Sequence, residues 1–434
     1  MYRFIHFGCW NNLNGVMKKL KDYIEETRSE PIKFISISGD NYYPEKVKTM
    51  VEGKEKKQKT IIKERLDSGF DCLPSGDFEY VMLMGNHDLE TNLYINEQDK
   101  ETNCSILRSE LDKKSDICLF NSKVIQFEDH QSSLCLFLDT SIYDHSDNVK
   151  YLSCYKIFIE LNPSQFKEEL KLLKKELMKT PNIPDITNFK EWVMETVDDV
   201  EEDPSTYMYD ESLAMNMYTL RTTGTVPPAL ILLNDTTDLM VLFILYLQKQ
   251  YVKKQITELK EKGLIKNIIM IGHHPIVCIK KKEKDDESFN TSLTSDIHIL
   301  FNDFFHSSVV SMFDITDQPT YYYLCADLHL YQSGTITLHP SDIVIHQYVV
   351  GTGGTPLDEE ITEEDISTLT TTNLSPYIEY EIKDKLHEFG FLNCTISPDH
   401  SIQFDFIVAP VIKSENRCTV KGGNRKRYTK KYKH

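Results

Sequence analysis

The chain carries the sequence NIIMIGHHP at residues 267–275, where four apolar residues run into a glycine and two histidines. A short apolar run bounded by such a polar turn predicts a buried β-strand over 267–271. The preceding segment, 251–262, has the apolar spacing of a helix and ends at Gly263, a residue that favours helix C-termini. This order of helix, strand and polar cluster is typical of a layered α/β or α+β fold.

Three other segments repeat the pattern of a strand that runs into a polar cluster. The predicted strands are 33–38, 80–84 and 321–325, and the clusters are GD at 39–40, GNHD at 85–88 and ADLH at 326–329. Ligands of layered α/β proteins bind at the carboxyl ends of strands, so we expect the four clusters to meet in one site. A glycine before Asp40, Asn86 and His273 allows a sharp turn and a close approach of backbone to a ligand.

The remaining predicted elements surround these four units. We expect strands at 2–7, 134–138 and 402–408, a helix at 16–27 and a charged, helical segment at 47–66. Between residues 143 and about 240 the regular pattern fades into polar and acidic sequence, which we interpret as an insertion.

Each polar cluster alone has an ordinary structural explanation. An aspartate after glycine, such as Asp40, is usually a turn or helix-capping residue. The pair at 273–274 is explained by backbone hydrogen bonds, and the cluster at 85–88 by a helix cap. Four such clusters at successive strand ends are harder to explain in this way. Their carboxylate, amide and imidazole groups suit zinc, manganese or iron, and therefore indicate a metal site.

The order of these clusters resembles that of the calcineurin-like metallophosphoesterases, and most closely of the purple (tartrate-resistant) acid phosphatases. The matching blocks are GCWN at 8–11, GDNYY at 39–43, GNHD at 85–88, GHHP at 272–275 and ADLH at 326–329, with weaker matches of LDT at 138–140 and VGTGG at 350–354. The resemblance covers residues 1–143 and 240–355, and it depends on the order and strand context of five blocks.

The resemblance implies a four-layer α/β/β/α sandwich with a large insertion. A metallophosphoesterase domain would comprise residues 1–143 and 240–412, an insertion or cap subdomain 144–239, and a basic tail 413–434. The implied activity is the hydrolysis of a phosphate ester, by default a monoester, by a metal-bound hydroxide at a dinuclear or partly degraded site.

The family's site residues carry over by position. Asp40 would bridge two ions of zinc, manganese or iron. Asn86, His273 and Asp327 would bind one of these ions. The other would be held by His329, Tyr43 and the residue at position 9. His87 would stabilise the leaving group or the developing charge, and His274 would contact the substrate phosphate.

Two positions depart from the family pattern. Cys9 replaces the aspartate of the first strand, and Asp327 replaces a histidine. Aspartate is a competent ligand. Cys9 has two interpretations, a thiolate that suits zinc but not manganese, or a small buried core residue that leaves the first ion weakly held or absent. The alternative to an active enzyme is therefore a catalytically inactive phosphoesterase-fold protein with a binding or structural role.

The charge of the chain is unevenly distributed. The 434 residues carry a net charge of −18, which argues against a nucleic-acid or anionic-membrane binder. Residues 413–434, however, hold nine Lys or Arg and one Glu, or +8, which leaves −26 for residues 1–412. This tail is either a solvated terminus or a segment that binds nucleic acid or an acidic partner. It weakly resembles the tails of giant DNA virus proteins, which suggests a virion or viral factory.

Compartment signals favour an intracellular protein. None of the ten cysteines forms a C-x-x-C pair, and the N-terminus lacks the features of a signal peptide. The most apolar stretch, 239–247, is about half the length of a membrane span, so we expect no spanning helix.

Overall fold

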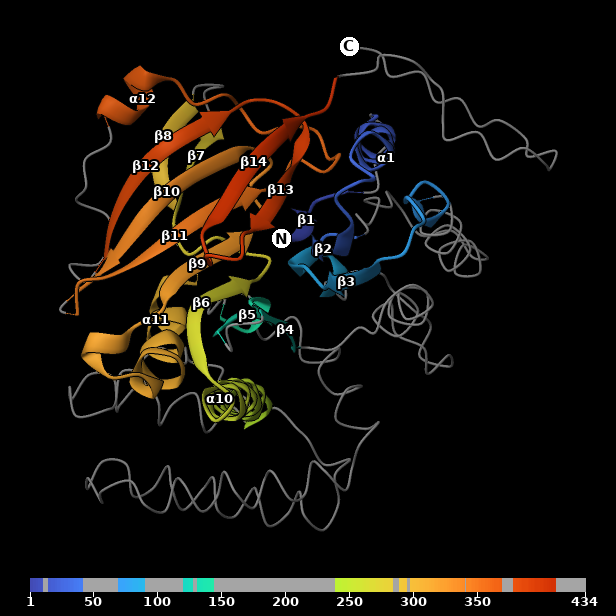
Figure 1. The fold of residues 1–434 in the computed structure, drawn as a ribbon. Helices are drawn as coiled ribbons and strands as arrows, with labels where there is room; N and C mark the ends of the chain where they lie inside the picture. Colours follow the sequence, from blue (N-terminus) through green and yellow to red (C-terminus); the bar gives the residue numbers. More distant parts are fainter. Residues whose placement is uncertain are drawn as a thin grey trace, which may run out of the picture.

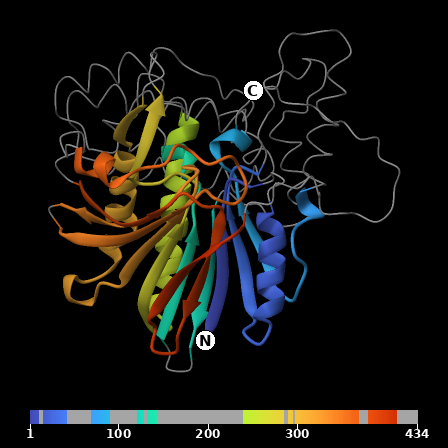
Figure 2. The same ribbon diagram turned by 90° about the horizontal axis from the view of Figure 1, so that it is seen from above.

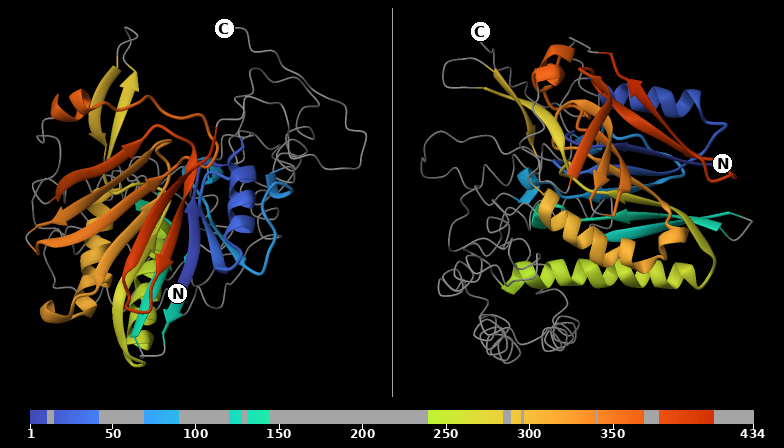
Figure 3. Two further views of the ribbon diagram at one scale, coloured as in Figure 1. Left: turned by 45° about the horizontal axis from the view of Figure 1, so that its top comes forward. Right: turned by 90° about the vertical axis from the view of Figure 1, so that its left-hand side faces the viewer.

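Two β-sheets pack face to face at the centre of the molecule, and helices cover their outer faces (Figures 1 and 3). The structure, a computed structural model, describes residues 1–10, 15–41, 69–89, 120–127, 131–143, 239–283, 289–294, 297–339, 341–368 and 378–410. The right-hand view of Figure 3 shows the four layers in order: α1, the smaller sheet, the larger sheet, and α10 with α11. The α/β/β/α arrangement expected from the sequence is confirmed.

The smaller sheet has five strands. Their spatial order is β14 (Ile402–Val408), β13 (Gly390–Ile396), β1 (Tyr2–Phe7), β2 (Ile32–Ser38) and β3 (Glu79–Leu83). β1, β2 and β3 are parallel, whereas β13 pairs antiparallel with both β1 and β14. The three parallel strands therefore end on the same edge of the sheet, beside the larger sheet (Figure 2).

The larger sheet has seven strands. Their spatial order is β12 (Ile378–Leu386), β10 (Tyr331–Leu338), β11 (Ile343–Val350), β9 (Thr320–Cys325), β6 (Leu264–Ile271), β5 (Gln131–Phe137) and β4 (Asn121–Gln126). β5, β6, β9 and β11 are parallel, so they also share one carboxyl edge. A separate hairpin of β7 (Cys278–Glu283) and β8 (Phe289–Thr294) projects beyond this sheet (Figure 3, left).

Within the described residues, three longer helices cover the sheets. They are α1 (Val16–Glu26), α10 (Leu239–Lys260) and α11 (His298–Ser308). The shorter helical elements are α3 (Asn86–Leu89), α12 (Glu363–Thr368) and the 3₁₀ turns η1 (Ser141–Tyr143), η4 (Val310–Met312) and η5 (Ile315–Asp317). α1 buries Val16, Met17 and Leu20 on one face, as its helical apolar spacing predicts.

Aromatic side chains fill the space between the sheets. The ring of Phe34 on β2 stacks on Phe4 of β1, with centroids 4.6 Å apart, and meets Phe137 of β5 edge-on at 5.8 Å. His6 on β1 joins the two sheets through its Nε2, which lies 3.3 Å from the carbonyl oxygen of Cys325. Burial lowers the pKa of His6 to about 4, so the ring is neutral in this core.

The predicted strands are all present with shifts of a few residues at their ends. The predicted helix at 251–262 is longer than expected, because α10 begins at Leu239 and includes the apolar stretch 239–247. That stretch therefore belongs to a helix that packs on the larger sheet. Within the described residues, no helix combines the length and the apolar character needed to cross a membrane.

Several expectations concern residues outside the described part of the chain. These are the helical segment 47–66, nearly all of the insertion 144–239, the tail 413–434 and Tyr43.

Candidate metal centre

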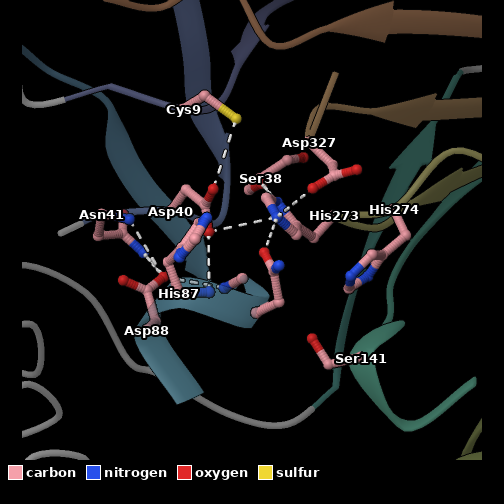
Figure 4. A network of polar contacts seen from close by, with 12 residues as sticks. Cys9, Ser38, Asp40, Asn41, His87, Asp88, Ser141, His273, His274 and Asp327 are labelled. Atoms are coloured by element: carbon pink, nitrogen blue, oxygen red, sulfur yellow. Dashed lines mark hydrogen bonds and ion pairs between the residues drawn. The ribbon is translucent and has the colours of Figure 1, made fainter. Parts of the chain in front are cut away.

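The polar clusters meet where the parallel strands of both sheets end (Figure 4). From the five-stranded sheet, Cys9 follows β1, Asp40 follows β2 and Asn86 follows β3. From the seven-stranded sheet, Thr140 follows β5, His273 follows β6, and Asp327 and His329 follow β9. The sequence-based expectation that these clusters converge is therefore correct.

Asp40 lies at the centre of the cluster and is almost completely buried. Its Oδ1 lies 3.3 Å from His273 Nε2 and accepts a hydrogen bond of 3.2 Å from the backbone N–H of His87. Its Oδ2 lies on the other side, 3.9 Å from Cys9 Sγ. The two oxygens of one carboxylate thus face two different sets of side chains.

The first of these sets is Cys9, Asp40 and His329, whose ligand atoms all lie within 4.8 Å of one another. Burial lowers the pKa of His329, although neighbouring carboxylates oppose the shift, so its ring favours the neutral form that binds metals. The backbone of His329 is held by Asp358, which accepts from His329 N at 2.9 Å and donates its own N–H to His329 O at 3.2 Å.

The second set is His273, His274 and Asp327, which meets the same 4.8 Å criterion. His273 is completely buried, and its Nδ1 lies 2.6 Å from the carbonyl oxygen of Ser38. A carbonyl can only accept, so Nδ1 carries a proton and donates it. Metal-binding histidines are commonly oriented by this contact.

Three oxygen atoms surround the other nitrogen of His273. Nε2 lies 3.0 Å from Asn86 Oδ1, 3.3 Å from Asp40 Oδ1 and 3.7 Å from Asp327 Oδ1. Burial by itself lowers the pKa of His273, but the two carboxylates outweigh it and raise the pKa to about 9. The oxygen atoms thus favour a positive charge at this point. A metal ion would supply that charge, and the imidazole would then be a neutral ligand.

Three site residues have left-handed backbone conformations. Cys9, Asp40 and Asp327 have φ angles of 50°, 52° and 56°, and they are three of the five non-glycine residues with positive φ in the described part of the chain. Such conformations cost free energy and concentrate at functional sites. At Cys9 the conformation is stabilised by Thr355, whose N–H and Oγ1 both donate to Cys9 O, at 2.9 and 2.8 Å.

Two glycines allow the strand ends to approach closely. A Cβ on Gly39, where φ is 79°, would lie 2.6 Å from Gly85 N, and a Cβ on Gly85 would lie 2.4 Å from Asp40 Oδ1. No side chain fits at these distances. These glycines therefore let the ends of β2 and β3 approach each other, and the expected approach of their backbone to a ligand stays a prediction.

Asp88 is a buried residue of the site to which the sequence analysis assigned no role. One oxygen, Oδ2, accepts from Gly85 N at 2.9 Å, Asn41 N at 3.1 Å and Asn41 Nδ2 at 2.9 Å. Burial and the nearby Asp40 raise the pKa of Asp88 to about 6. Asn41 also accepts from Trp10 Nε1 at 2.9 Å, so the carboxylate joins the loops that follow three strands.

Thr140 is a second unassigned residue. Its Oγ1 accepts from the backbone N–H groups of His273, at 2.9 Å, and His274, at 3.0 Å. It also lies 3.2 Å from His274 Nδ1. The two N–H groups occupy both lone pairs of the hydroxyl, so the hydroxyl donates to Nδ1. A neutral His274 then carries its proton on Nε2.

Comparison with known proteins finds no matching family model and no matching curated protein. Among solved structures, the one titled "Structure of PhoD" aligns with 96% of this chain and 67% of that chain, at 11% sequence identity and a TM-score of 0.45. A similarity at this level assigns neither a family nor a function, and it does not single out the purple acid phosphatases.

Proposed function

We propose that this chain is a metal-dependent phosphoesterase of the calcineurin-like type, with phosphate monoesters as the default substrates. The observation that carries the proposal is the position of Asp40. Its Oδ1 faces His273 and its Oδ2 faces Cys9, so one carboxylate lies between two sets of candidate ligands. The order of the sequence blocks, which resembles that family, supports the same assignment.

The side chains present fit metal ions. Asp40 would bridge, Cys9 and His329 would bind on one side, and Asn86, His273 and Asp327 on the other. The raised pKa of His273 indicates an excess of negative charge at this point, and its Nδ1–H contact with Ser38 O orients the ring for ligation. When bound, metal ions supply Lewis-acid chemistry that neutralises these carboxylates and withdraws charge from phosphoryl oxygens.

Two histidines would act on the substrate itself. His274 presents Nε2–H as a hydrogen-bond donor, because Thr140 occupies its Nδ1. This donor would bind a phosphoryl oxygen of the substrate. His87, whose backbone is fixed by Asp40 at 3.2 Å, would stabilise the leaving oxygen or provide it with a proton.

The chemical types of the candidate ligands also limit which metal ions the site would bind. Cys9 would contribute a thiolate on one side, whereas the other side has only imidazole, carboxylate and amide donors. Thiolates favour zinc and iron over manganese and magnesium. We therefore propose zinc or iron on the Cys9 side, and zinc, manganese or iron on the side of His273.

Metal analysis combined with hydrolysis of an aryl phosphate tests the proposal. The purified chain is loaded with zinc, manganese or iron, and metal content and turnover are measured together. Asp40→Asn should lose bound metal and at least about 100-fold in turnover. The exposed Asp317→Asn variant is the control and should behave as the unmodified chain. No turnover with any of the metals would contradict the proposed enzyme.

The same experiment separates the alternative, a phosphoesterase-fold protein without catalysis. That alternative rests on Cys9 and Asp327, which replace the usual ligands of the family. It predicts no turnover and a weakly held or absent first ion in the unmodified chain, and restored metal occupancy or turnover in Cys9→Asp. Turnover in the unmodified chain would exclude it.

A further inference from the structure

Ser141, the first residue of η1, has a hydroxyl group without a hydrogen bond. Its side chain is completely buried, and Oγ has no hydrogen-bond partner among the described residues. Most buried hydroxyls are paired, because leaving one unpaired costs its lost hydration. An unpaired hydroxyl beside a candidate active site therefore points to a ligand as its missing partner.

The backbone around Ser141 is held in place. Ser141 N donates to Asp139 Oδ1 at 3.0 Å, and Tyr143 N donates to Thr140 O at 3.1 Å. Asp139 is in turn tied to α10, since its N–H donates to Gln248 Oε1 at 2.9 Å. These contacts fix the backbone of the turn that carries Ser141 Oγ.

The hydroxyl points into the site. In Figure 4 it is directed towards the side on which His273 and His274 lie, and no contact joins it to the residues drawn there. The preceding residue, Thr140, binds the backbone N–H groups of both histidines. Ser141 and His274 are therefore positioned through the same residue, Thr140.

We infer that Ser141 Oγ donates a hydrogen bond to a phosphoryl oxygen of the substrate, beside the contact from His274 Nε2–H. The inference rests on the proposed phosphoesterase function and adds a substrate-binding residue to it. The oxygens of a phosphate ester are hydrogen-bond acceptors, so a phosphoryl group would supply the partner that the Ser141 hydroxyl lacks.

Phosphate binding to the metal-loaded chain tests the inference. Inorganic phosphate is titrated by calorimetry into the unmodified chain and into Ser141→Ala, and thermal unfolding of both is measured without phosphate. Ser141→Ala should weaken phosphate binding about tenfold, equivalent to about 1.4 kcal/mol. Its Tm should stay the same or rise, because the substitution removes an unpaired buried hydroxyl.

Ser133→Ala is the matched control. Ser133 is equally buried on β5, but its Oγ accepts a hydrogen bond of 3.0 Å from Asn267 Nδ2, far along the strand from the site. This variant should lower Tm and leave phosphate affinity unchanged. The same change from serine to alanine should therefore lower phosphate affinity but not Tm at position 141, and lower Tm but not phosphate affinity at position 133.

Three results would overturn the inference. Unchanged phosphate affinity in Ser141→Ala would exclude the contact while leaving the metal site and the proposed function intact. A lower Tm together with weaker binding would assign Ser141 a structural role. Failure of the metal-loaded, unmodified chain to bind phosphate at all would overturn both this inference and the proposed function.

Discussion

Cys9 and Asp40 lie side by side at the ends of neighbouring parallel strands, with Cys9 Sγ 3.9 Å from Asp40 Oδ2. Both residues have left-handed backbone, and Cys9 N donates to Gly39 O at 3.2 Å. Cysteine has little intrinsic preference for this conformation. Left-handed backbone in non-glycine residues concentrates at functional sites, and Cys9 is also completely buried. Its two interpretations, as a thiolate ligand and as a core residue, both stay predictions.

Substituting Cys9 should change the metal preference. Cys9→Asp should shift binding from zinc towards manganese, and Cys9→Ser should weaken zinc binding by at least about tenfold. Metal content after equilibration with equal zinc and manganese measures the shift. The cobalt-loaded chain should show a thiolate-to-cobalt charge-transfer band that both variants lack. Identical spectra in all three chains would make Cys9 a core residue.

Thr140 should be needed to position both histidines. In Thr140→Val the shape is kept but the N–H groups of His273 and His274 lose their acceptor. We expect a loss of about 2–4 kcal/mol in the free energy of unfolding, measured with urea, and of about 10–100-fold in metal affinity. Thr140→Ser keeps the hydroxyl, so it should retain most of the free energy of unfolding and most of the metal affinity. Equal behaviour of the two variants would mean that the hydroxyl is dispensable.

A methyl group at Gly85 should displace Asp40. The added Cβ in Gly85→Ala would lie 2.4 Å from Asp40 Oδ1 and 2.5 Å from Asp40 N. We expect a destabilisation of about 1–3 kcal/mol and loss of bound metal. Gly76→Ala is the control, because the atoms nearest to its Cβ belong to the ring of Phe78 and not to the candidate metal ligands. Full metal occupancy in Gly85→Ala would contradict this packing.

Acid should destabilise the fold through His6. The unfolded chain protonates this residue near pH 6.5, whereas the folded chain does so near pH 4, because burial lowers the pKa. Between these values the unfolded state binds more protons, so stability falls as pH drops from 6.5 to 4, by about 3 kcal/mol in total. Above pH 6.5 this contribution is constant.

Urea unfolding between pH 4 and 7.5 measures the effect. His6→Gln keeps a hydrogen-bond donor and an acceptor but does not titrate in this range. In this variant the free energy of unfolding should no longer show the fall between pH 6.5 and 4 that is due to His6. Parallel curves for the two chains would show that His6 does not titrate as described.

Much of the architecture was predictable from the strand ends. β2, β3, β6 and β9 each combine a short apolar run with an immediate polar cluster, and this pattern appears directly in the sequence. Seven described strands, β4, β7, β8, β10, β11, β12 and β13, were not predicted. In β7 and β8, CIKKKE and FNTSLT lack a clear alternation of apolar and polar residues. α10 was predicted too short, because its first half is apolar on all sides and shows no helical period.

The convergence of the candidate ligands was predictable from the sequence, but their supporting contacts were not. Asp88 and Thr140 act through hydrogen bonds to loops that are distant in sequence, and residue spacing does not indicate those bonds. The orientation of Cys9 depends on a single φ angle of 50°. The roles of Tyr43 and of the basic tail 413–434 stay predictions, since both lie outside the described residues.

The first candidate ligand set draws on both sheets, and the second does so once Asp40 and Asn86 are included. Cys9 and Asp40 belong to the five-stranded sheet, whereas His273, Asp327 and His329 belong to the seven-stranded sheet. An ion held by the two sets would therefore fasten the layers together, and separating the layers would destroy the site. At a free metal concentration of 1,000 times Kd, binding would raise the free energy of unfolding by about 4 kcal/mol. Removal of metal by a chelator should then weaken the cooperativity between the two halves of the core, so that each sheet unfolds more nearly on its own.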